Sequence, residues 1–409
     1  MWPTASTVAI IGAGSAGLFA AKRCLSEGFL DVTVFEQTAN VGGTWVYSPE
    51  INTHSSMYET MIANIPKQIM FPPDAPLKND GSQESFVSHQ VVREYLEDYA
   101  KEVRHLIKFN TKVEKVERSG EKWKILSRSV NGESEGFFDI VFVCNGHYFK
   151  PSFPSMTREF KKRALHSHNY RKPQDFMGEI VAVVGAGFSG TDIALQVAPE
   201  AKKVYLLHRN APEFNGLPSN IIECQALKDI GPDGESLLLE DDSTLDDVDT
   251  VIFCTGYDYD FPFFDESIIE VKENGKVVSP LCLHMLHTTY TKSLFLIGLP
   301  FYSLPFPLAD YQIRFALAVV KGNAEISAEE LKNYEEERMK RVLERYGNKD
   351  KFHKIVSELF DLMREYARRG RFEDTIDYGK AERFVVHLGK RRDANLVGYK
   401  NESYDFLFD

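Results

Sequence analysis

The chain has 409 residues, of which 43% are hydrophobic and 12% are aromatic. This content supports a large buried core and excludes a disordered chain, because burial can offset the entropy of ordering. Lys and Arg total 48 against 60 Asp and Glu, a net charge of −12 that argues against nucleic acid or an anionic membrane as an obligatory partner. The five scattered cysteines form no Cys-x-x-Cys pair, which indicates buried thiols and neither a disulfide framework nor a metal site.

No targeting or membrane segment is expected. The first apolar strand begins at Val8, which leaves no room before it for the regions of a secretory signal. The longest uncharged run, 293–309, is short for a membrane span, and its three prolines argue against a helix there. We therefore expect a soluble protein without a membrane span, either cytoplasmic or secreted after removal of a signal peptide.

The stretch 8–36 has the pattern of a dinucleotide-binding βαβ unit. An apolar strand leads into Gly12, Gly14 and Gly17, a helical pattern follows, and a second apolar strand ends at Glu36. In this fingerprint the first glycine permits the tight turn, the second lets a pyrophosphate approach the backbone, and the third allows close packing of helix and strand. A carboxylate at the end of the second strand accepts ribose hydroxyls, so the unit is typical of an FAD site.

The stretch 180–209 repeats this layout with Gly185, Gly187 and Gly190. It ends at Arg209, which stands as far from Gly185 as Glu36 stands from Gly12. A guanidinium can pair with the 2′-phosphate that a carboxylate would repel, so this unit is typical of an NADPH site. His208, next to Arg209, is a second candidate contact for that phosphate when protonated.

Further apolar strands end before a glycine at 140–146, 251–256 and 294–298, and the chain from about 324 is helical and charged. We predict an α/β fold with two Rossmann-like domains, in which a smaller NADPH domain is inserted in a larger FAD domain. The expected limits are 1–150 for the first part of the FAD domain, 151–284 for the NADPH domain with its linkers, and 285–409 for the second part with a C-terminal helical segment.

Four further segments resemble motifs of the flavin-containing monooxygenases, and the resemblance covers nearly the whole chain. V-G-G-T-W at 41–45 is similar to the family's flavin-site loop, and S-M-Y-E-T-M-I-A-N-I-P-K at 56–67 to its S-x-Y-x-x-L-x-T-N-x-P-K segment. The stretch 160–170 resembles the identifying F-x-G-x-x-x-H-x-x-x-[YF] motif, and F-C-T-G-Y at 253–257 resembles A-T-G-Y. The chain departs from these patterns at Ala63, Lys162 and Phe188, where the family has Thr, Gly and commonly Asn.

The resemblance implies a reaction. NADPH would reduce FAD, the reduced flavin would capture dioxygen as a C4a-hydroperoxide, and one oxygen atom would pass to a nucleophilic nitrogen or sulfur. The partners would be dioxygen and a small substrate carrying such an atom, and the product an N- or S-oxide. The compact chain looks most like insect members, including alkaloid N-oxygenases, which points to a tertiary-amine alkaloid or a xenobiotic. The identity of the substrate and the oligomeric state, including a homo-oligomer, stay open.

The resemblance also assigns site residues. Asn64 is the expected catalytic residue beside the flavin, against the alternative of a turn asparagine before Pro66. His166 and Tyr170 are expected to hold the linker between domains more than to do chemistry, and the role of His54 is open. The residues expected to bind cofactor are Gly12, Ala13, Gly14, Ser15, Ala16, Gly17, Glu36, Gln37, Gly43, Thr44, Trp45, Asn64, Val113 and Gln312 for FAD, and Gly185, Gly187, Ser189, Gly190, Thr191, Asp192 and Arg209 for NADPH, with no metal ligand. Gln312 and Arg314 are expected at the start of a helix that follows Pro307.

Three alternatives remain at this stage. A flavin disulfide reductase would share both nucleotide sites but needs a redox cysteine pair, which the spacing does not provide. A Baeyer–Villiger monooxygenase acting on ketones carries a related motif that ends in tryptophan, where this chain has Tyr170. A catalytically idle flavin-binding module would consume NADPH without an oxygenated product.

Overall fold

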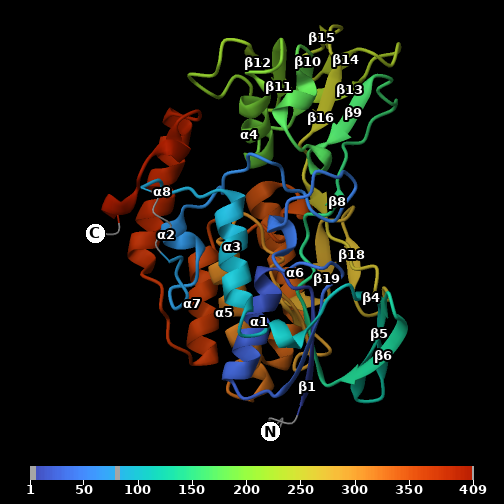
Figure 1. The fold of residues 1–409 in the computed structure, drawn as a ribbon, viewed down its shortest axis with the longest axis vertical. Helices are drawn as coiled ribbons and strands as arrows, with labels where there is room; N and C mark the ends of the chain where they lie inside the picture. Colours follow the sequence, from blue (N-terminus) through green and yellow to red (C-terminus); the bar gives the residue numbers. More distant parts are fainter. Residues whose placement is uncertain (1–5, 79–82, 408–409) are drawn as a thin grey trace.

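The computed structural model describes residues 6–78 and 83–407. The first five residues of the predicted FAD domain and the last two of its second part therefore lie outside the described residues. The chain forms two α/β units placed end to end along its long axis, the smaller one above the larger one in Figure 1. Within the described residues, no helix is long and apolar enough to cross a membrane.

The larger unit is built on a seven-stranded sheet. Five of its strands are mutually parallel and lie in the order β22-β7-β1-β2-β3, and β20 and β21 continue the sheet in antiparallel fashion. Their bounds are β1 Thr7–Ile11, β2 Asp31–Phe35, β3 Ile107–Lys108, β7 Ile140–Val143, β20 Leu281–Cys282, β21 Leu286–His287 and β22 Leu294–Leu296. The central strand β7 is buried throughout, as expected for a parallel strand covered on both faces.

Helices cover one face of this sheet, and small antiparallel sheets cover the other. On the helical face α5 packs against both α1 and α7, and 14 of its 16 residues are buried. The helices are α1 Ser15–Ser26, α2 Lys67–Met70, α3 His89–Ala100, α5 Pro305–Val320, α6 Ala328–Tyr346, α7 Leu359–Gly370 and α8 Tyr378–Ala394. The opposite face carries a second core around Trp123, formed with β4 Lys112–Ser119, β5 Lys122–Ser129, β6 Gly132–Phe138, β18 Glu270–Lys272 and β19 Val277–Ser279.

The smaller unit is a five-stranded, fully parallel sheet in the order β12-β11-β10-β16-β9. Helix α4 (Phe188–Val197) packs on one face, and the three-stranded sheet β13-β14-β15 packs on the other. The strand bounds are β9 Arg163–His166, β10 Ile180–Val184, β11 Lys203–Leu207, β12 Ile221–Cys224, β13 Leu227–Ile230, β14 Leu237–Leu239, β15 Thr244–Leu245 and β16 Thr250–Phe253. The predicted fold class, with two Rossmann-like sheets, is confirmed.

Short elements complete the chain. The two crossings between the units run side by side, because β8 (Lys150–Pro151) pairs with β17 (Tyr257–Asp258). The 3-10 helices are η1 Gly43–Trp45, η2 Arg104–Leu106, η3 Ser167–Asn169, η4 Pro173–Phe176, η5 Lys349–Lys351, η6 Tyr399–Asn401 and η7 Asp405–Leu407. Tyr259, Phe261 and Phe263, just after β17, are buried in the core of the larger sheet. We therefore propose that the smaller domain ends near residue 256, before the limit of 284 expected from the sequence.

The expected start of the helix after Pro307 is wrong. Helix α5 already begins at Pro305, so two of the prolines that argued against a helix in 293–309 lie in its first turn. Proline is tolerated there because the first amides of a helix have no intrahelical partner. Gln312 consequently lies in the third turn of α5, away from the helix N-terminus at which we expected it.

A partly buried ion pair joins α1 to α5. Arg23 donates from Nε to Oδ1 of Asp310 at 2.7 Å and from Nη2 to Oδ2 at 3.0 Å. The Asp310 side chain is only 4% exposed, and burial raises the pKa of its carboxyl against the opposing effect of Arg23. Arg23 also pairs with the more exposed Asp74 at 2.7 Å. The helix that follows the first glycine turn is thus fixed to the main buried helix of the unit.

We predict that Arg23→Met lowers the free energy of unfolding by about 3 kcal/mol, because it leaves the Asp310 carboxylate buried without its forked partner. The matched control is Lys22→Met, which removes the exposed ion pair between Lys22 and Glu102 and should cost under about 1 kcal/mol. Chemical unfolding of the two variants measures the difference. Equal losses of unfolding free energy in both variants would show that the buried ion pair stabilises the fold no more than the exposed one.

Candidate active site between two nucleotide turns

In the first glycine turn, the fold requires glycine at two positions but leaves space for a side chain at the third. Gly12 has φ +103°, and a Cβ there would lie 2.5 Å from the carbonyl oxygen of Cys144. A Cβ on Gly17 would lie 1.9 Å from the carbonyl oxygen of Gly12. A Cβ on Gly14 would meet only Gly43, whose Cα would lie at an ordinary 3.6 Å. The open space at Gly14 is therefore available to a ligand that approaches the backbone.

The second turn has the same construction. Gly185 again has φ +103°, and a Cβ there would lie 2.7 Å from the carbonyl oxygen of Cys254. A Cβ on Gly190 would lie 1.7 Å from the carbonyl oxygen of Gly185, whereas a Cβ on Gly187 would meet nothing within 4 Å. The duplication seen in the sequence thus extends to the carbonyl beneath each turn and to one open glycine in each.

Each turn ends at an uncapped helix N-terminus. Gly14 is the N-cap of α1 and Gly187 is the N-cap of α4, and neither helix end is capped by a side chain. Backbone N–H groups and the positive end of the helix dipole are therefore open to an anion at both places. The first turn of α1 contains Ser15 and Ala16, and that of α4 contains the exposed Ser189. Both turns fit a dinucleotide pyrophosphate.

Glu36 is buried beside the first turn and already oriented. Its Oε2 accepts the Ala13 N–H at 2.9 Å, and its Oε1 accepts both the N–H and the hydroxyl of Thr38 at 2.8 Å. A carboxylate has about four acceptor positions, so capacity remains for ribose hydroxyls. Val113 is buried at the start of β4, close to the Glu36 backbone, whose oxygen accepts the Thr111 N–H at 2.8 Å. Gln37 is exposed.

The loop 42–45 folds against the first turn, as the resemblance implies. The Gly42 N–H donates to the Ala13 oxygen at 3.0 Å, and Gly43 approaches Gly14 closely. Thr44 lies within hydrogen-bond distance of Ser56, at 3.2 Å between their hydroxyl oxygens. Trp45 is half-buried and packs edge-on against Phe306 at 6.2 Å between ring centroids. The expected flavin loop therefore lies at the open glycine of the expected FAD turn.

Arg209 and His208 differ in their surroundings. Arg209 is exposed just after the end of β11, where a guanidinium can reach a ligand held at the second turn. His208 is buried, with Nε2 2.8 Å from Oε1 of Glu223 and Nδ1 3.7 Å from Glu213. Because both ring nitrogens face carboxylates, our expectation that His208 shares a phosphate with Arg209 is not supported by the geometry. Selection for the 2′-phosphate would then depend on Arg209.

One lysine joins Asn64 to the second turn. The Lys400 ammonium donates to Oδ1 of Asn64 at 2.7 Å, to the Ile62 oxygen at 3.1 Å and to Oδ1 of Asp192 at 3.2 Å. Asp192 lies on the first turns of α4, next to the second glycine turn. The residue expected at the flavin and a residue expected at NADPH therefore share one cation. Sequence reasoning missed Lys400, because a lysine in a charged C-terminal segment has the pattern of a solvated surface.

The Asp192 side chain is occupied by protein contacts. Besides Lys400, its carboxylate accepts the Tyr58 hydroxyl and, at 3.1 Å, the Gln196 amide. These bonds link the first unit, through Tyr58, with α4 of the second. A nucleotide contact from Asp192 therefore stays a prediction for its backbone, while its side chain connects the two units. Thr191 is similarly turned inward, donating its hydroxyl to the Gly187 oxygen at 3.0 Å.

His166 and Tyr170 have linker surroundings. His166 is buried, its Nδ1 accepts the His168 N–H at 3.1 Å, and burial lowers its pKa to about 4, so it is neutral near pH 7. The Tyr170 hydroxyl donates to Gln196 at 3.2 Å. The buried Arg171 guanidinium donates to the backbone oxygens of Glu50, His168 and Tyr170, which fastens the loop near 50 to the linker. The geometry favours the linker role for both residues, and His54 is half-buried nearby.

Gln312 is fully buried and holds the end of another strand. Its Oε1 accepts the Gly298 N–H at 2.9 Å, and its amide nitrogen lies 3.5 Å from the Tyr366 hydroxyl. The side chain is therefore committed to the protein interior. Any contribution of Gln312 to cofactor binding stays a prediction that would act through the position of Gly298.

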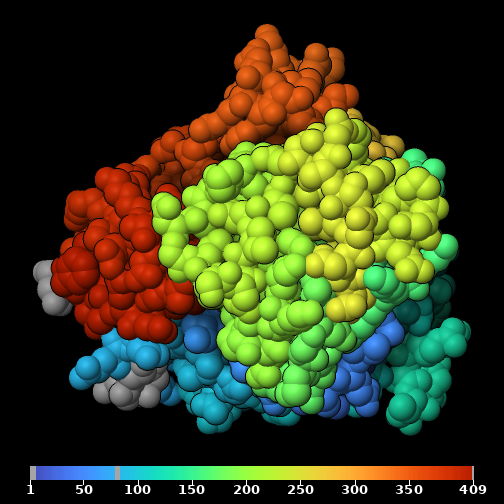
Figure 2. Space-filling model, turned by 90° about the horizontal axis from the view of Figure 1, so that it is seen from above, coloured from blue at the N-terminus to red at the C-terminus, as the bar shows by residue number. Residues whose placement is uncertain are grey.

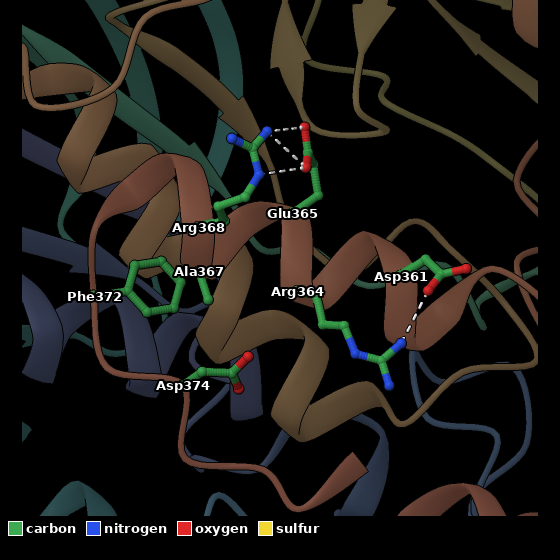
Figure 3. Close-up of a pocket in the computed structure, with 7 residues that line it drawn as sticks. All are labelled: Asp361, Arg364, Glu365, Ala367, Arg368, Phe372 and Asp374. Carbon is green, nitrogen blue, oxygen red and sulfur yellow. Dashed lines mark hydrogen bonds and ion pairs between the residues drawn. The ribbon is translucent and has the colours of Figure 1, made fainter. Parts of the chain in front are cut away.

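A cavity of about 390 Å³ lies elsewhere, on α7 and the loop that follows it (Figure 3). None of the predicted site residues lines it, and its charged groups pair locally, as in the contacts of Arg364 with Asp361 and of Arg368 with Glu365. We therefore place the candidate site at the two glycine turns. Viewed from above, the C-terminal segment lies beside the smaller unit, as the contacts of Lys400 and Arg392 with α4 require (Figure 2).

Comparisons with known proteins identify the family of the chain. The family profile described as flavin-binding monooxygenase-like matches residues 5–214 and 215–370. The flavin-containing monooxygenase FMO GS-OX-like 7 of Arabidopsis thaliana is 34% identical, over 80% of this chain and 76% of its own length. Among solved structures, S-allyl-L-cysteine S-oxygenase from Allium sativum is similar with a TM-score of 0.90 and 30% identity, covering 99% of this chain and 97% of its own. Tmm from Pelagibacter sp. strain HTCC7211 gives a TM-score of 0.83 at 26% identity, covering 97% and 93%.

The chain belongs to the flavin-binding monooxygenase-like family. It is an NADPH-dependent flavin monooxygenase, and the predicted cofactors FAD and NADPH are those of the family. The two turns fit two dinucleotide cofactors, since each turn keeps one open glycine at an uncapped helix end.

We predict that the glycines divide into two classes on substitution. Gly14→Ala should give folded protein with strongly reduced FAD content, because its Cβ contacts the protein only at an ordinary distance but fills the ligand space. Gly187→Ala should keep FAD and lose NADPH affinity for the same reason. Gly17→Ala is the matched control and should not yield stable protein, since its Cβ would lie 1.9 Å from a backbone oxygen. Flavin absorbance, thermal unfolding and nucleotide titration measure these outcomes; normal FAD content in Gly14→Ala would contradict the assignment.

Proposed function

We propose that the enzyme transfers one oxygen atom from dioxygen to a soft nucleophilic sulfur or nitrogen of a small substrate, giving an S- or N-oxide. Similarity to an S-oxygenase along nearly the whole chain supports sulfur as a target. Nitrogen, as in a tertiary-amine alkaloid or a xenobiotic, is the second target supported by the sequence resemblance. Both atoms attack with a lone pair, so the same site suits both.

The observation that carries this proposal is the shared ammonium of Lys400. It brings Asn64 and Asp192, from the expected flavin and nicotinamide sides, within hydrogen-bond distance of one atom. A reaction that couples the two cofactors requires their sites to meet, and the contacts of Lys400 support a meeting of the two expected sites at this point. FAD, when bound, supplies the reduction and activation of dioxygen, which amino-acid side chains do not provide.

The residues divide the work of binding and orientation. Gly14 and Gly187 leave room for the two pyrophosphates, and Glu36 would accept the ribose hydroxyls of FAD. Arg209 would pair with the 2′-phosphate of NADPH. Asn64 is the proposed catalytic residue: because its Oδ1 accepts from Lys400, its Nδ2 is the donor left for the cofactor site. Arg171 donates to the Glu50 oxygen and so fixes the loop that leads to Asn64.

We predict sulfoxide or N-oxide formation from a dialkyl sulfide and a tertiary amine, and no lactone from a cyclic ketone. Asn64→Ala should keep its FAD and lower the amount of product per NADPH consumed roughly tenfold, because a hydrogen-bond donor is lost from the site. Asn131→Ala, in the exposed β5–β6 turn, is the control and should behave as wild type. Lactone formation would favour the ketone-oxidising alternative, NADPH use without product would favour the idle module, and unchanged coupling in Asn64→Ala would make Asn64 a turn residue only.

We predict that Arg209→Ala raises the KM for NADPH by roughly 10- to 150-fold, the loss of a charge-assisted contact of about 1.5–3 kcal/mol. The KM for NADH should change little, because NADH lacks the 2′-phosphate. The control is Lys202→Ala. Lys202 is an exposed cation just before the start of β11, whereas Arg209 follows the end of that strand. The measurement is the ratio of kcat/KM for NADPH to that for NADH. A wild-type preference for NADH, or an unchanged ratio in the variant, would show that Arg209 does not bind the phosphate.

A further inference from the structure

Lys400 is a mostly buried cation in a segment whose sequence is otherwise typical of a charged surface. Its side chain is 11% exposed, and its three ammonium N–H groups have three acceptors: Asn64 Oδ1, the Ile62 oxygen and Asp192 Oδ1. Burying an ammonium is costly unless it is paired and hydrogen-bonded, and burial lowers the pKa of this one against the effect of Asp192. Because burying the ammonium is unfavourable, we expect this lysine to have a structural or functional role.

The contact determines how the Asn64 amide is oriented. An ammonium group can only donate hydrogen bonds, so the atom of Asn64 that faces it must be the carbonyl oxygen. The NH2 group of the amide is thereby turned away from Lys400. Without the ammonium, the amide could rotate by 180° and present an acceptor in place of the donor.

The fold of the C-terminal segment does not depend on this ammonium. Tyr399 and Tyr404 are buried, and both pack edge-on against Phe86 with ring centroids 5.5 and 5.8 Å apart. The Tyr404 N–H also donates to Ser85 Oγ at 2.7 Å. These contacts hold the backbone on both sides of Lys400, so the ammonium can be removed while the segment stays anchored.

The segment makes a second contact with the smaller unit. Helix α8 runs along the larger unit toward the smaller one (Figure 1), and the Arg392 guanidinium lies over the Phe188 ring at 5.1 Å and 3.4 Å from the Thr191 hydroxyl. The C-terminal segment therefore reaches the first two turns of α4 at two places. Lys400 alone among these contacts also reaches Asn64.

We propose that Lys400 is a positioning residue of the monooxygenase: it fixes the Asn64 amide with its donor toward the cofactor site and, through Asp192, sets Asn64 against the NADPH-binding unit. This inference rests on the proposed function of Asn64. It makes the C-terminal segment a third part of the active site, beside the two nucleotide turns.

The test replaces Lys400 by methionine, which keeps the apolar stem and removes the ammonium. The control is Lys390→Met, an exposed lysine on α8. Lys400→Met should bind FAD as wild type does but should lose most of the change that NADP⁺ induces in the visible circular dichroism of the bound flavin. Product per NADPH should fall roughly tenfold, and Lys390→Met should change neither readout.

A double-mutant cycle decides whether Lys400 acts through Asn64. In the Asn64→Ala background, Lys400→Met should lower product per NADPH by less than about twofold further, because the two residues form one unit. The proposal would be overturned if the two substitutions lowered product per NADPH by independent factors that multiply in the double variant. A normal spectral response to NADP⁺ in Lys400→Met would also overturn it. A wild-type enzyme without oxygenated product would instead refute the proposed function, and the spectral response would still test Lys400.

An unfolding measurement tests the contact itself without any reaction. Asn64→Asp keeps an oxygen for Lys400 and adds a negative charge, so its thermal midpoint should equal or exceed that of wild type. The same change in the Lys400→Met background should lower the midpoint, because the carboxylate then lacks its cation. A lowered thermal midpoint in the single variant Asn64→Asp would overturn the proposal. This measurement does not need Lys400→Met to fold.

Discussion

The candidate active site depends on two places where a helix approaches the glycine turn before it so closely that no side chain fits between them. At Gly17 and at Gly190 a Cβ would lie less than 2 Å from the carbonyl oxygen of the first glycine of the turn. This approach places the N-termini of α1 and α4 at the edge of their sheets, where their free N–H groups face the ligand side. The open glycines, Gly14 and Gly187, are useful only because their neighbours impose this geometry.

We propose that one side chain in each unit gives the same backbone arrangement a different selectivity. Glu36 is buried and fixed by the Ala13 and Thr38 amides, so a negative charge stands at the first site in a defined position. Arg209 is exposed and can adjust to its ligand. A fixed carboxylate suits a cofactor that stays bound, whereas an exposed guanidinium suits one that enters and leaves with each turnover. The proposed division between FAD and NADPH follows from this contrast.

Local sequence patterns were sufficient to predict the parts of the site that a single βαβ unit determines. The strands, the glycine turns, Glu36 and the position of Arg209 all depend on residues close in sequence, and the structure has them as expected. The start of α5 was wrong because proline was weighed as a helix breaker without regard to its position in the first turn. The packing of 257–279 on the larger sheet and the role of Lys400 could not be predicted, since both join residues more than 100 positions apart.

Polar side chains connect the two units around the site, beside apolar contacts such as the packing of Tyr58 in the core of the smaller unit. Arg171 bonds to the Glu50 oxygen, and Tyr58 and Lys400 bond to Asp192; each such hydrogen bond involves a charged group and contributes about 1.5–3 kcal/mol in net terms. Such contacts can yield one at a time, unlike the shared core of a continuous sheet. An interface of this kind can admit and release a nucleotide while Asn64 remains in place. This requires at least one contact that couples the position of the second unit to that of the first. Lys400 meets that condition, since it is bonded to both sides at once.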